Sequence, residues 1–228
     1  MSSFEERWAT VCTAMERAAA RSGRKIKDVE LVAVSKGHPP EAIAEAVAAG
    51  QTLFGESKVQ EAKVKVAEAA SMARWHFIGH LQKNKVRQAL PLFELIESID
   101  SLELARDVDR IAEELGLRPR VLLEVNVAGE SSKFGFSPEK LRAQMEELLA
   151  LPRLEIEGLM TVPPPVPEAE DSRRYFAQLR ELRDALQREF SMGLPALSMG
   201  MSGDYPVAVE EGATLVRVGT ALFGERRK

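Results

Sequence analysis

The run Leu31-Val32-Ala33-Val34-Ser35-Lys36 is apolar until its last two residues, and Gly37-His38-Pro39-Pro40 follows it. A short apolar run with β-branched residues, stopped by glycine and proline, predicts a buried β-strand. Side chains alternate along a strand, so Val32, Val34 and Lys36 share one face and the lysine ends a buried column. An amine that loses hydration there suits Schiff-base chemistry with a carbonyl compound. The alternative is a strand-end lysine that extends its amine into water.

Similar apolar runs recur along the chain, and amphipathic helical stretches fill most of the gaps between them. Eight candidate strands lie near residues 31–35, 51–54, 75–78, 94–97, 120–127, 154–160, 195–199 and 214–218. Candidate helices lie at about 3–21, 40–49, 57–70, 82–90, 101–115, 138–149 and 168–190, with room for a short helix in 200–213. This alternation predicts an α/β protein, a single (β/α)8 TIM barrel that spans residues 1–228 as one domain. A doubly wound open sheet is the alternative fold.

The composition argues against several other classes of protein. A formal net charge of −4 does not favour binding to nucleic acid or to anionic membranes. The single cysteine excludes a disulfide framework, and no apolar run approaches the roughly 18 residues that span a bilayer. The first residues lack the cationic start and apolar core of a signal peptide. We therefore expect a cytoplasmic protein that binds neither nucleic acid nor membranes.

Residues capable of chemistry gather where the predicted strands end. In (β/α)8 barrels the active site lies at this end, and phosphate groups commonly bind at the loops after strands 7 and 8. The seventh predicted strand ends in Ser198-Met199-Gly200-Met201-Ser202-Gly203, which offers hydroxyls and small residues. The eighth ends at Gly219-Thr220, where backbone N–H groups can approach an anion. The alternative interpretation is two ordinary turns.

A lysine amine beside a phosphate pocket points to pyridoxal 5′-phosphate (PLP), whose aldehyde condenses with lysine. Arg217, two residues before Gly219, would then face the pyridine nitrogen. Because a guanidinium is always protonated, it disfavours a protonated ring and weakens the electron sink that PLP enzymes use. The alternative role for Arg217 is a salt bridge at the barrel rim or at an interface.

Several motifs between residues 31 and 224 carry a resemblance to a known family. They are residues 31–36 (LVAVSK), 54–56 (FGE) with 59–61 (VQE), 75–82 (WHFIGHLQ) with 84–85 (NK), 158–161 (GLMT), 197–202 (LSMGMS) and 215–224 (LVRVGTALFG). In this order they resemble the YggS/PROSC family of pyridoxal phosphate homeostasis proteins. That family is a single barrel of the alanine racemase N-domain type, a fold-type III arrangement for PLP.

The resemblance also implies roles for individual residues. Lys36 would carry PLP as a Schiff base, and Arg217 would lie near the pyridine nitrogen. Further residues are implied as cofactor contacts, the first four of them around the phosphate: Ser198, Met199, Gly219, Thr220, and Met160 after the sixth predicted strand.

Three positions depart from the family pattern or extend it. Ser57 stands where the family usually has an asparagine near the cofactor; a hydroxyl is shorter and offers fewer donors, so this contact is either lost or bridged by water. His38 stands where a second lysine is common, and we expect it to face solvent. Lys133 matches a family lysine and either touches the cofactor or is a surface residue.

The histidines do not indicate a metal site. His76 lies inside the third predicted strand, where a buried and hydrogen-bonded histidine is expected between Trp75 and Phe77, which pack between barrel and helices. His80 lies at the mouth and either approaches the cofactor ring or holds its loop. No set of histidine, cysteine and carboxylate residues has metal-ligand spacing, so no metal is expected.

Together these features predict a PLP carrier or regulator that acts in PLP homeostasis rather than an enzyme. An alanine racemase places a tyrosine base opposite its lysine. Here Tyr175 lies in a helix outside the predicted barrel, and Tyr205 points to no second base. The alternatives are a minimal PLP-dependent amino-acid racemase and, ranked last, a phosphosugar aldolase that uses Lys36. The expected partners are PLP and PLP-dependent apoenzymes, and the expected state is a monomer.

Overall fold

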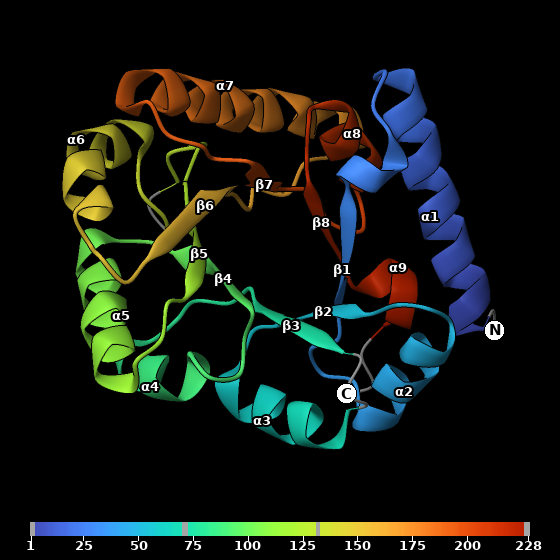
Figure 1. Ribbon diagram of the computed structural model, residues 1–228. Coiled ribbons are helices and arrows are strands. Elements are labelled where there is room, and N and C mark those ends of the chain that lie inside the picture. The colour runs from blue at the N-terminus through green and yellow to red at the C-terminus, as the bar shows by residue number, and fades with distance from the viewer. Residues whose placement is uncertain (1–2, 70–72, 131–132, 226–228) are drawn as a thin grey trace.

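Eight parallel strands close into a barrel in the computed structural model, which describes residues 3–69, 73–130 and 133–225 (Figure 1). Each strand pairs with its neighbours in sequence, and β1 pairs with β8 to close the ring, with Val32 opposite Arg217. The predicted (β/α)8 barrel is therefore confirmed, and the open sheet is wrong. The strands are β1 Glu30–Val34, β2 Leu53–Glu56, β3 Arg74–Phe77, β4 Leu95–Ile99, β5 Arg120–Glu124, β6 Glu155–Met160, β7 Ala196–Ser198 and β8 Leu215–Val218.

Helices surround the ring of strands, as Figure 1 shows. They are α1 Phe4–Arg21, α2 Pro40–Ala48, α3 Val59–Glu68, α4 Val86–Ala89, α5 Leu102–Leu115, α6 Pro138–Leu149, α7 Arg173–Phe190, α8 Tyr205–Glu210 and α9 Thr220–Phe223. Short 3-10 turns cover Ile26–Asp28, Lys83–Lys85 and Ala169–Ser172. The predicted helix over 82–90 is thus a 3-10 turn followed by one helical turn, and residue 70 of another predicted helix lies outside the described residues. Within the described part of the chain, no helix has both the length and the apolar character to cross a membrane.

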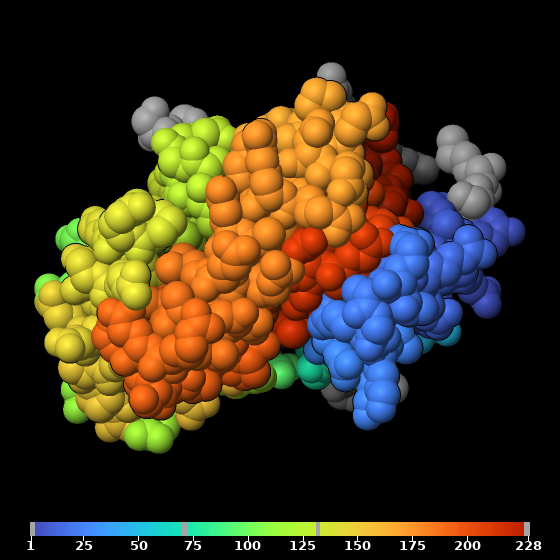
Figure 2. All heavy atoms as spheres, turned by 90° about the horizontal axis from the view of Figure 1, so that it is seen from above, coloured from blue at the N-terminus to red at the C-terminus, as the bar shows by residue number. Residues whose placement is uncertain are grey.

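Local sequence signals explain where the helices begin and end. Ser3 Oγ accepts a hydrogen bond from the Glu6 amide and the Glu6 carboxylate accepts one from the Ser3 amide, which forms a capping box for α1. Helix α5 begins at the Ser101 cap and ends at Gly116, whose φ of 67° lies in the left-handed region. Helix α1 packs against α8. Figure 2 shows this side of the molecule: red residues from the C-terminal part of the chain lie between α7, in orange, and residues near the N-terminus, in blue.

The core has two layers, as the alternation along the strands requires. The inner layer fills the barrel with Val32, Leu53, Leu95, Leu122, Met160 and Leu215. Their strand neighbours, such as Leu31 and Ala33, belong to the larger outer layer between barrel and helices. Trp75 and Phe77 lie in this outer layer, as predicted.

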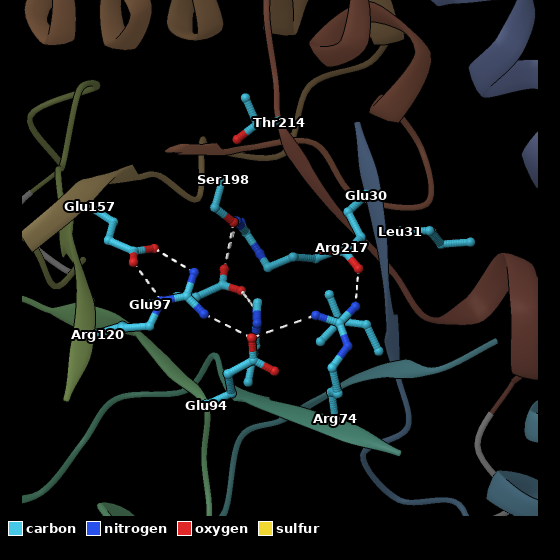
Figure 3. A network of polar contacts seen from close by, with 12 residues as sticks. Glu30, Leu31, Arg74, Glu94, Glu97, Arg120, Glu157, Ser198, Thr214 and Arg217 are labelled. Atoms are coloured by element: carbon cyan, nitrogen blue, oxygen red, sulfur yellow. Dashed lines mark hydrogen bonds and ion pairs between the residues drawn. The ribbon is translucent and has the colours of Figure 1, made fainter. Parts of the chain in front are cut away.

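Five charged residues, which we call the charged ring, line a hollow at the amino ends of the barrel strands (Figure 3). Arg74 pairs with Glu30 and with Glu94, and Arg120 pairs with Glu94 at 2.8 Å. The Arg120 guanidinium also donates two hydrogen bonds to Glu157. Single exposed pairs contribute little stability, about 0–1 kcal/mol each, but here the charges alternate in one connected network.

Candidate functional site

A cavity of about 320 Å³ lies at the opposite end, where β1 and β8 finish. Its lining includes Lys36, Ser202, Gly203, Arg217, Gly219 and Thr220. A larger groove of about 550 Å³ runs along the outside of α1, but its lining comes from one helix face and Pro206. The smaller cavity has the location and the convergent polar groups typical of a ligand site in this fold.

Lys36 reaches this cavity because of the side-chain alternation along β1. Val32 belongs to the inner core layer, whereas Val34 and Lys36, two and four residues later, line the cavity. Val162, which packs against the same inner layer, also lines the cavity. The lysine therefore ends a column of inward side chains, as the sequence predicts, and is half-buried.

Arg217 enters the cavity from inside the barrel and is only 4% exposed. Its guanidinium donates to the Ser198 hydroxyl at 2.5 Å (Figure 3). It also donates to the Thr161 carbonyl oxygen at 2.8 Å. Ser198 Oγ in turn donates to Glu97 Oε2 at 2.5 Å. The guanidinium is thus held by two hydrogen bonds that it donates, one to β7 and one to the residue after β6, and Ser198 links it to Glu97 on β4. Burial lowers the pKa of Arg217, although the negative charges of nearby carboxylates act to raise this pKa.

Glu97 supplies the negative charge that faces this buried arginine. It is completely buried on β4, its Oε2 lies 3.8 Å from Arg217 Nη1, and its Oε1 lies 2.7 Å from His76 Nδ1. Burial alone would raise the pKa of Glu97, but the hydrogen bond and charge of His76, and then the charge of Arg217, hold it below its usual range. The prediction that His76 is a buried, hydrogen-bonded histidine is confirmed.

The turn between β8 and α9 presents backbone N–H groups at the other side of the cavity. The Gly219 and Ala221 amides donate to Ser202 Oγ at 3.1 and 3.3 Å. A Cβ on Gly219 would meet the Val34 carbonyl oxygen at 3.3 Å, whereas one on Gly203 would meet nothing within 4 Å. Two donors of this turn therefore converge on one oxygen, Ser202 Oγ, from the loop after β7, and the space at the neighbouring Gly203 is open.

Helix α1 holds α9, and hence this turn, from outside. Arg7 Nε donates to the Leu222 carbonyl oxygen at 2.5 Å, and the Phe4 and Phe223 rings lie 5.2 Å apart. The His38 ring lies 5.1 Å from Phe223 and is half-buried at the cavity wall. The prediction that His38 faces solvent is therefore right only in part, because Phe223 from the far end of the chain packs beside a ring that is still partly exposed.

Four predicted cofactor contacts lie outside the lining of the cavity. The Ser198 side chain is turned to Arg217 and Glu97, and Met199 is fully buried in the outer core layer. Met160 belongs to the inner layer, where it packs below the cavity. Ser57 lines a separate cavity of about 370 Å³ between the start of α3 and the β3 loop.

His80 and Lys133 also lie away from the main cavity. His80 lines the separate cavity, contacts Asp100 through Nδ1 at 2.9 Å, and stacks on Phe134 at a ring distance of 3.8 Å. Of the two alternatives for His80, the structure favours the one in which it holds its loop. Lys133 is exposed.

Glu124 is a mouth residue that the sequence interpretation missed. It ends β5, two residues after the inward-facing Leu122. Burial, helped by the charge of Asp100, raises the pKa of Glu124 to about 7, although Arg217 and Lys133 oppose the shift. Its place in the strand alternation was a signal that could have identified it. Ser202 and Gly203 also line the cavity, and their signal was the run of small residues after the seventh strand.

Within the described residues, no group of three or more histidine, cysteine and carboxylate side chains could hold a metal ion. The two tyrosines lie outside the cavity lining: Tyr175 is on the outer helix α7, and Tyr205 begins α8. Lys36 is the single lysine among the described residues that line the cavity. The site therefore offers one amine, one fixed guanidinium and a turn rich in backbone donors.

The parallel barrel with a lysine at the end of its first strand defines the class of alanine-racemase-type barrels, and sequence comparison identifies the same class. A family model described as "Alanine racemase, N-terminal domain" matches residues 12–227. Solved alanine racemase from Clostridium difficile is 16% identical, with a TM-score of 0.70 over 95% of this chain and 60% of that chain, which supports the shared fold.

Nearer relatives narrow the class. The chain is 46% identical to the "Pyridoxal phosphate homeostasis protein" of Aquifex aeolicus over 97% of this chain and 98% of that one. It is 45% identical to the protein of the same name from Pseudomonas aeruginosa, over 99% and 97% of the two chains. The structure of PipY from Synechococcus elongatus with PLP bound is 45% identical and superposes with a TM-score of 0.83, covering 92% of this chain and all of that one. The chain belongs to the family of pyridoxal phosphate homeostasis proteins.

Proposed function

We propose that this protein binds PLP in the cavity at the end of β1 and β8 and acts in PLP homeostasis as a carrier or regulator. In this proposal Lys36 holds the cofactor as a Schiff base. The observation that carries it is the meeting, in one cavity, of the half-buried Lys36 amine, the buried Arg217 guanidinium and the donor-rich turn at Gly219 and Thr220. The PLP bound by the related PipY supports the same assignment.

The residues present fit the chemical groups of PLP. An aldehyde requires an amine, a phosphate requires donors, and the pyridine nitrogen requires a polar partner. Lys36, the turn at Gly219 and Thr220, and Arg217 meet these three needs in turn, with Ser202 and Gly203 beside the phosphate. Ser198 acts by holding Arg217, and Met160 and Met199 act by packing around the site. Ser57, in the neighbouring cavity, contacts the cofactor at most through water.

We propose further that the protein is not an enzyme. Bound PLP supplies an electron sink for reactions at amino-acid carbons, and a cationic Arg217 at the ring nitrogen would weaken it. Racemisation also needs a second proton-transfer group opposite the lysine. No tyrosine lines the cavity among the described residues. A minimal amino-acid racemase is the alternative, and sustained racemisation abolished by Lys36→Ala would establish it.

Several statements about the whole protein stay predictions. They are the single domain over residues 1–228, the monomeric state, the cytoplasmic location, and the transfer of PLP to PLP-dependent apoenzymes.

Borohydride reduction of the PLP-loaded protein, followed by peptide mapping, tests the proposed function. We expect one pyridoxyl adduct, on Lys36, and its loss in Lys36→Ala. Lys58→Ala is the matched control, because Lys58 lines the separate cavity. An adduct found solely on Lys58 or Lys133 would refute the assignment.

A further inference from the structure

A buried ionic cluster lies behind the strand end that carries Lys36. Lys65 of α3 is 2% exposed, and its Nζ lies 2.5 Å from Glu56 Oε1 and 2.7 Å from Glu61 Oε1. Glu56 ends β2 and is completely buried. We call Glu56, Glu61 and Lys65 the α3 cluster. Buried ion pairs often contribute no net stability, since each charge loses its hydration. A purely stabilising role therefore does not account for this arrangement.

Three hydrogen bonds tie the α3 cluster to the two residues that flank Lys36. Lys65 Nζ donates to the Ser35 carbonyl oxygen at 2.7 Å, and Ser35 Oγ donates to Glu56 Oε1 at 2.6 Å. On the other side, the Gly37 amide donates to Glu61 Oε1 at 2.6 Å. Gly37 has a φ of 77°, a left-handed conformation that glycine adopts readily. The backbone on both sides of Lys36 is thus attached to one set of charges.

The balance of charge in the α3 cluster depends on Lys65. The Glu56 Oε2 atom is buried without a hydrogen-bond partner, so this carboxylate is held through Oε1 alone. Burial raises the pKa of Glu56, against the hydrogen bonds from Lys65 and Ser35. Burial alone would also raise the pKa of Glu61, but the hydrogen bonds from Lys65 and from the Gly37 amide keep this pKa below its usual range. Removal of Lys65 would leave two neighbouring carboxylates without their shared cation.

We propose that the α3 cluster positions Lys36 for Schiff-base formation by fixing the backbone of residues 35–37. This inference rests on the proposed function. None of Glu56, Glu61 and Lys65 lines the cavity, so they are positioning residues that act through the main chain. A lysine side chain has many rotamers, and a fixed backbone confines the arc that its amine can reach. The amine of Lys36 is then presented toward the cavity rather than toward solvent.

Glu61→Ala and Lys65→Met test this positioning role, with Lys63→Met as the matched control. Lys63 is on the same helix but is exposed, and its amine donates to Gln88 Oε1 at 3.0 Å, away from the α3 cluster. Two ligands separate imine formation from simple binding: PLP, and pyridoxine 5′-phosphate, which has an alcohol in place of the aldehyde. We expect Glu61→Ala to weaken PLP binding roughly tenfold, as for one lost hydrogen bond to a charged group. Binding of pyridoxine 5′-phosphate should not change.

Two further measurements make the test specific. Hydrogen exchange of the ligand-free protein should show faster exchange of the Gly37 amide in Glu61→Ala than in Lys63→Met. Glu61→Gln keeps an oxygen acceptor for this amide and should restore much of the PLP affinity. Glu61 has a side chain that is 25% exposed, so it carries the test if Lys65→Met does not fold.

The results that would overturn the inference are distinct from those that would overturn the proposed function. If Glu61→Ala and Lys65→Met bind PLP as the wild type does, the α3 cluster does not position Lys36. If both variants lose PLP and pyridoxine 5′-phosphate equally, the cluster supports the cavity as a whole and the positioning role is wrong. If the wild type forms no adduct on Lys36, the proposed function fails first, and the inference with it.

Discussion

Replacing Glu97 by glutamine would leave Arg217 buried in the barrel without its nearest carboxylate. The two side chains are 0% and 4% exposed, and Arg217 Nη1 lies 3.8 Å from Glu97 Oε2, with the Ser198 hydroxyl bonded to both side chains. Removal of one partner of a buried ion pair typically costs about 3–5 kcal/mol. For a domain of this size each kcal/mol shifts the melting temperature by about 2–4 °C. We therefore expect Glu97→Gln to melt roughly 6–20 °C below the wild type at pH 7.

The pH dependence of this difference distinguishes a charge effect from a packing effect. The pKa of Glu97 is lower in the folded protein than its ordinary value, because the hydrogen bond from His76 and then Arg217 outweigh burial. Such a group stabilises the fold above its unfolded pKa, and this contribution is lost as the pH falls through the folded pKa. The gap between wild type and Glu97→Gln should therefore narrow below about pH 4.

Calorimetry at several pH values provides the measurement, and Glu94→Gln provides the control. Glu94 belongs to the charged ring and is 33% exposed, so its variant should lose no more than about 1 kcal/mol. An unchanged melting temperature for Glu97→Gln at pH 7, or a loss that persists in acid, would refute the argument that Glu97 compensates the charge of Arg217.

Three further changes probe the mouth and the barrel wall. Because the pKa of Glu124 is raised to about 7, the stability of the wild type should fall as the pH rises toward that value. Glu124→Gln should therefore melt above the wild type at pH 8 and lose this advantage near pH 4.5. An equal advantage at both pH values would contradict the raised pKa. Thr220→Ala should weaken PLP binding by roughly tenfold to a hundredfold without affecting pyridoxal, as measured by titration of both ligands; equal loss for both would argue against a phosphate contact. A Cβ at Gly158 would lie 1.9 Å from the Ala196 carbonyl oxygen, so Gly158→Ala should melt well below Gly203→Ala, and equal melting would contradict this crowding.

The barrel and the location of Lys36 could be predicted because they depend on local patterns. Each apolar run is long enough for one strand, and each gap holds about one helix, so the strand number follows from counting. The inward column of Val32, Val34 and Lys36 follows from the alternation of side chains alone. These features need no knowledge of which strands or helices meet.

The details of the site could not be predicted in this way because they depend on contacts between distant segments. Ser198 turns toward Glu97, which lies 101 residues earlier in the chain, rather than toward the phosphate turn. His38 packs beside Phe223 of the last described helix, which leaves its ring half-buried. The link between Lys65 and the Ser35 backbone crosses 30 residues and two elements. Residue type and spacing say nothing about such pairings.

The charged ring and the cavity lie at opposite ends of the same strands, and this separation bears on how the family can diversify. Substitutions at the mouth leave the paired arginines and glutamates at the other end untouched, so a new ligand preference need not weaken this charge network. Conversely, substitution of the partly exposed residues of the charged ring changes the stability of the fold by small amounts and leaves the geometry around Lys36 unchanged. A laboratory selection for new binding could therefore randomise the residues of the mouth and keep the charged ring unchanged, so that the ring's contribution to stability offsets destabilising substitutions at the mouth.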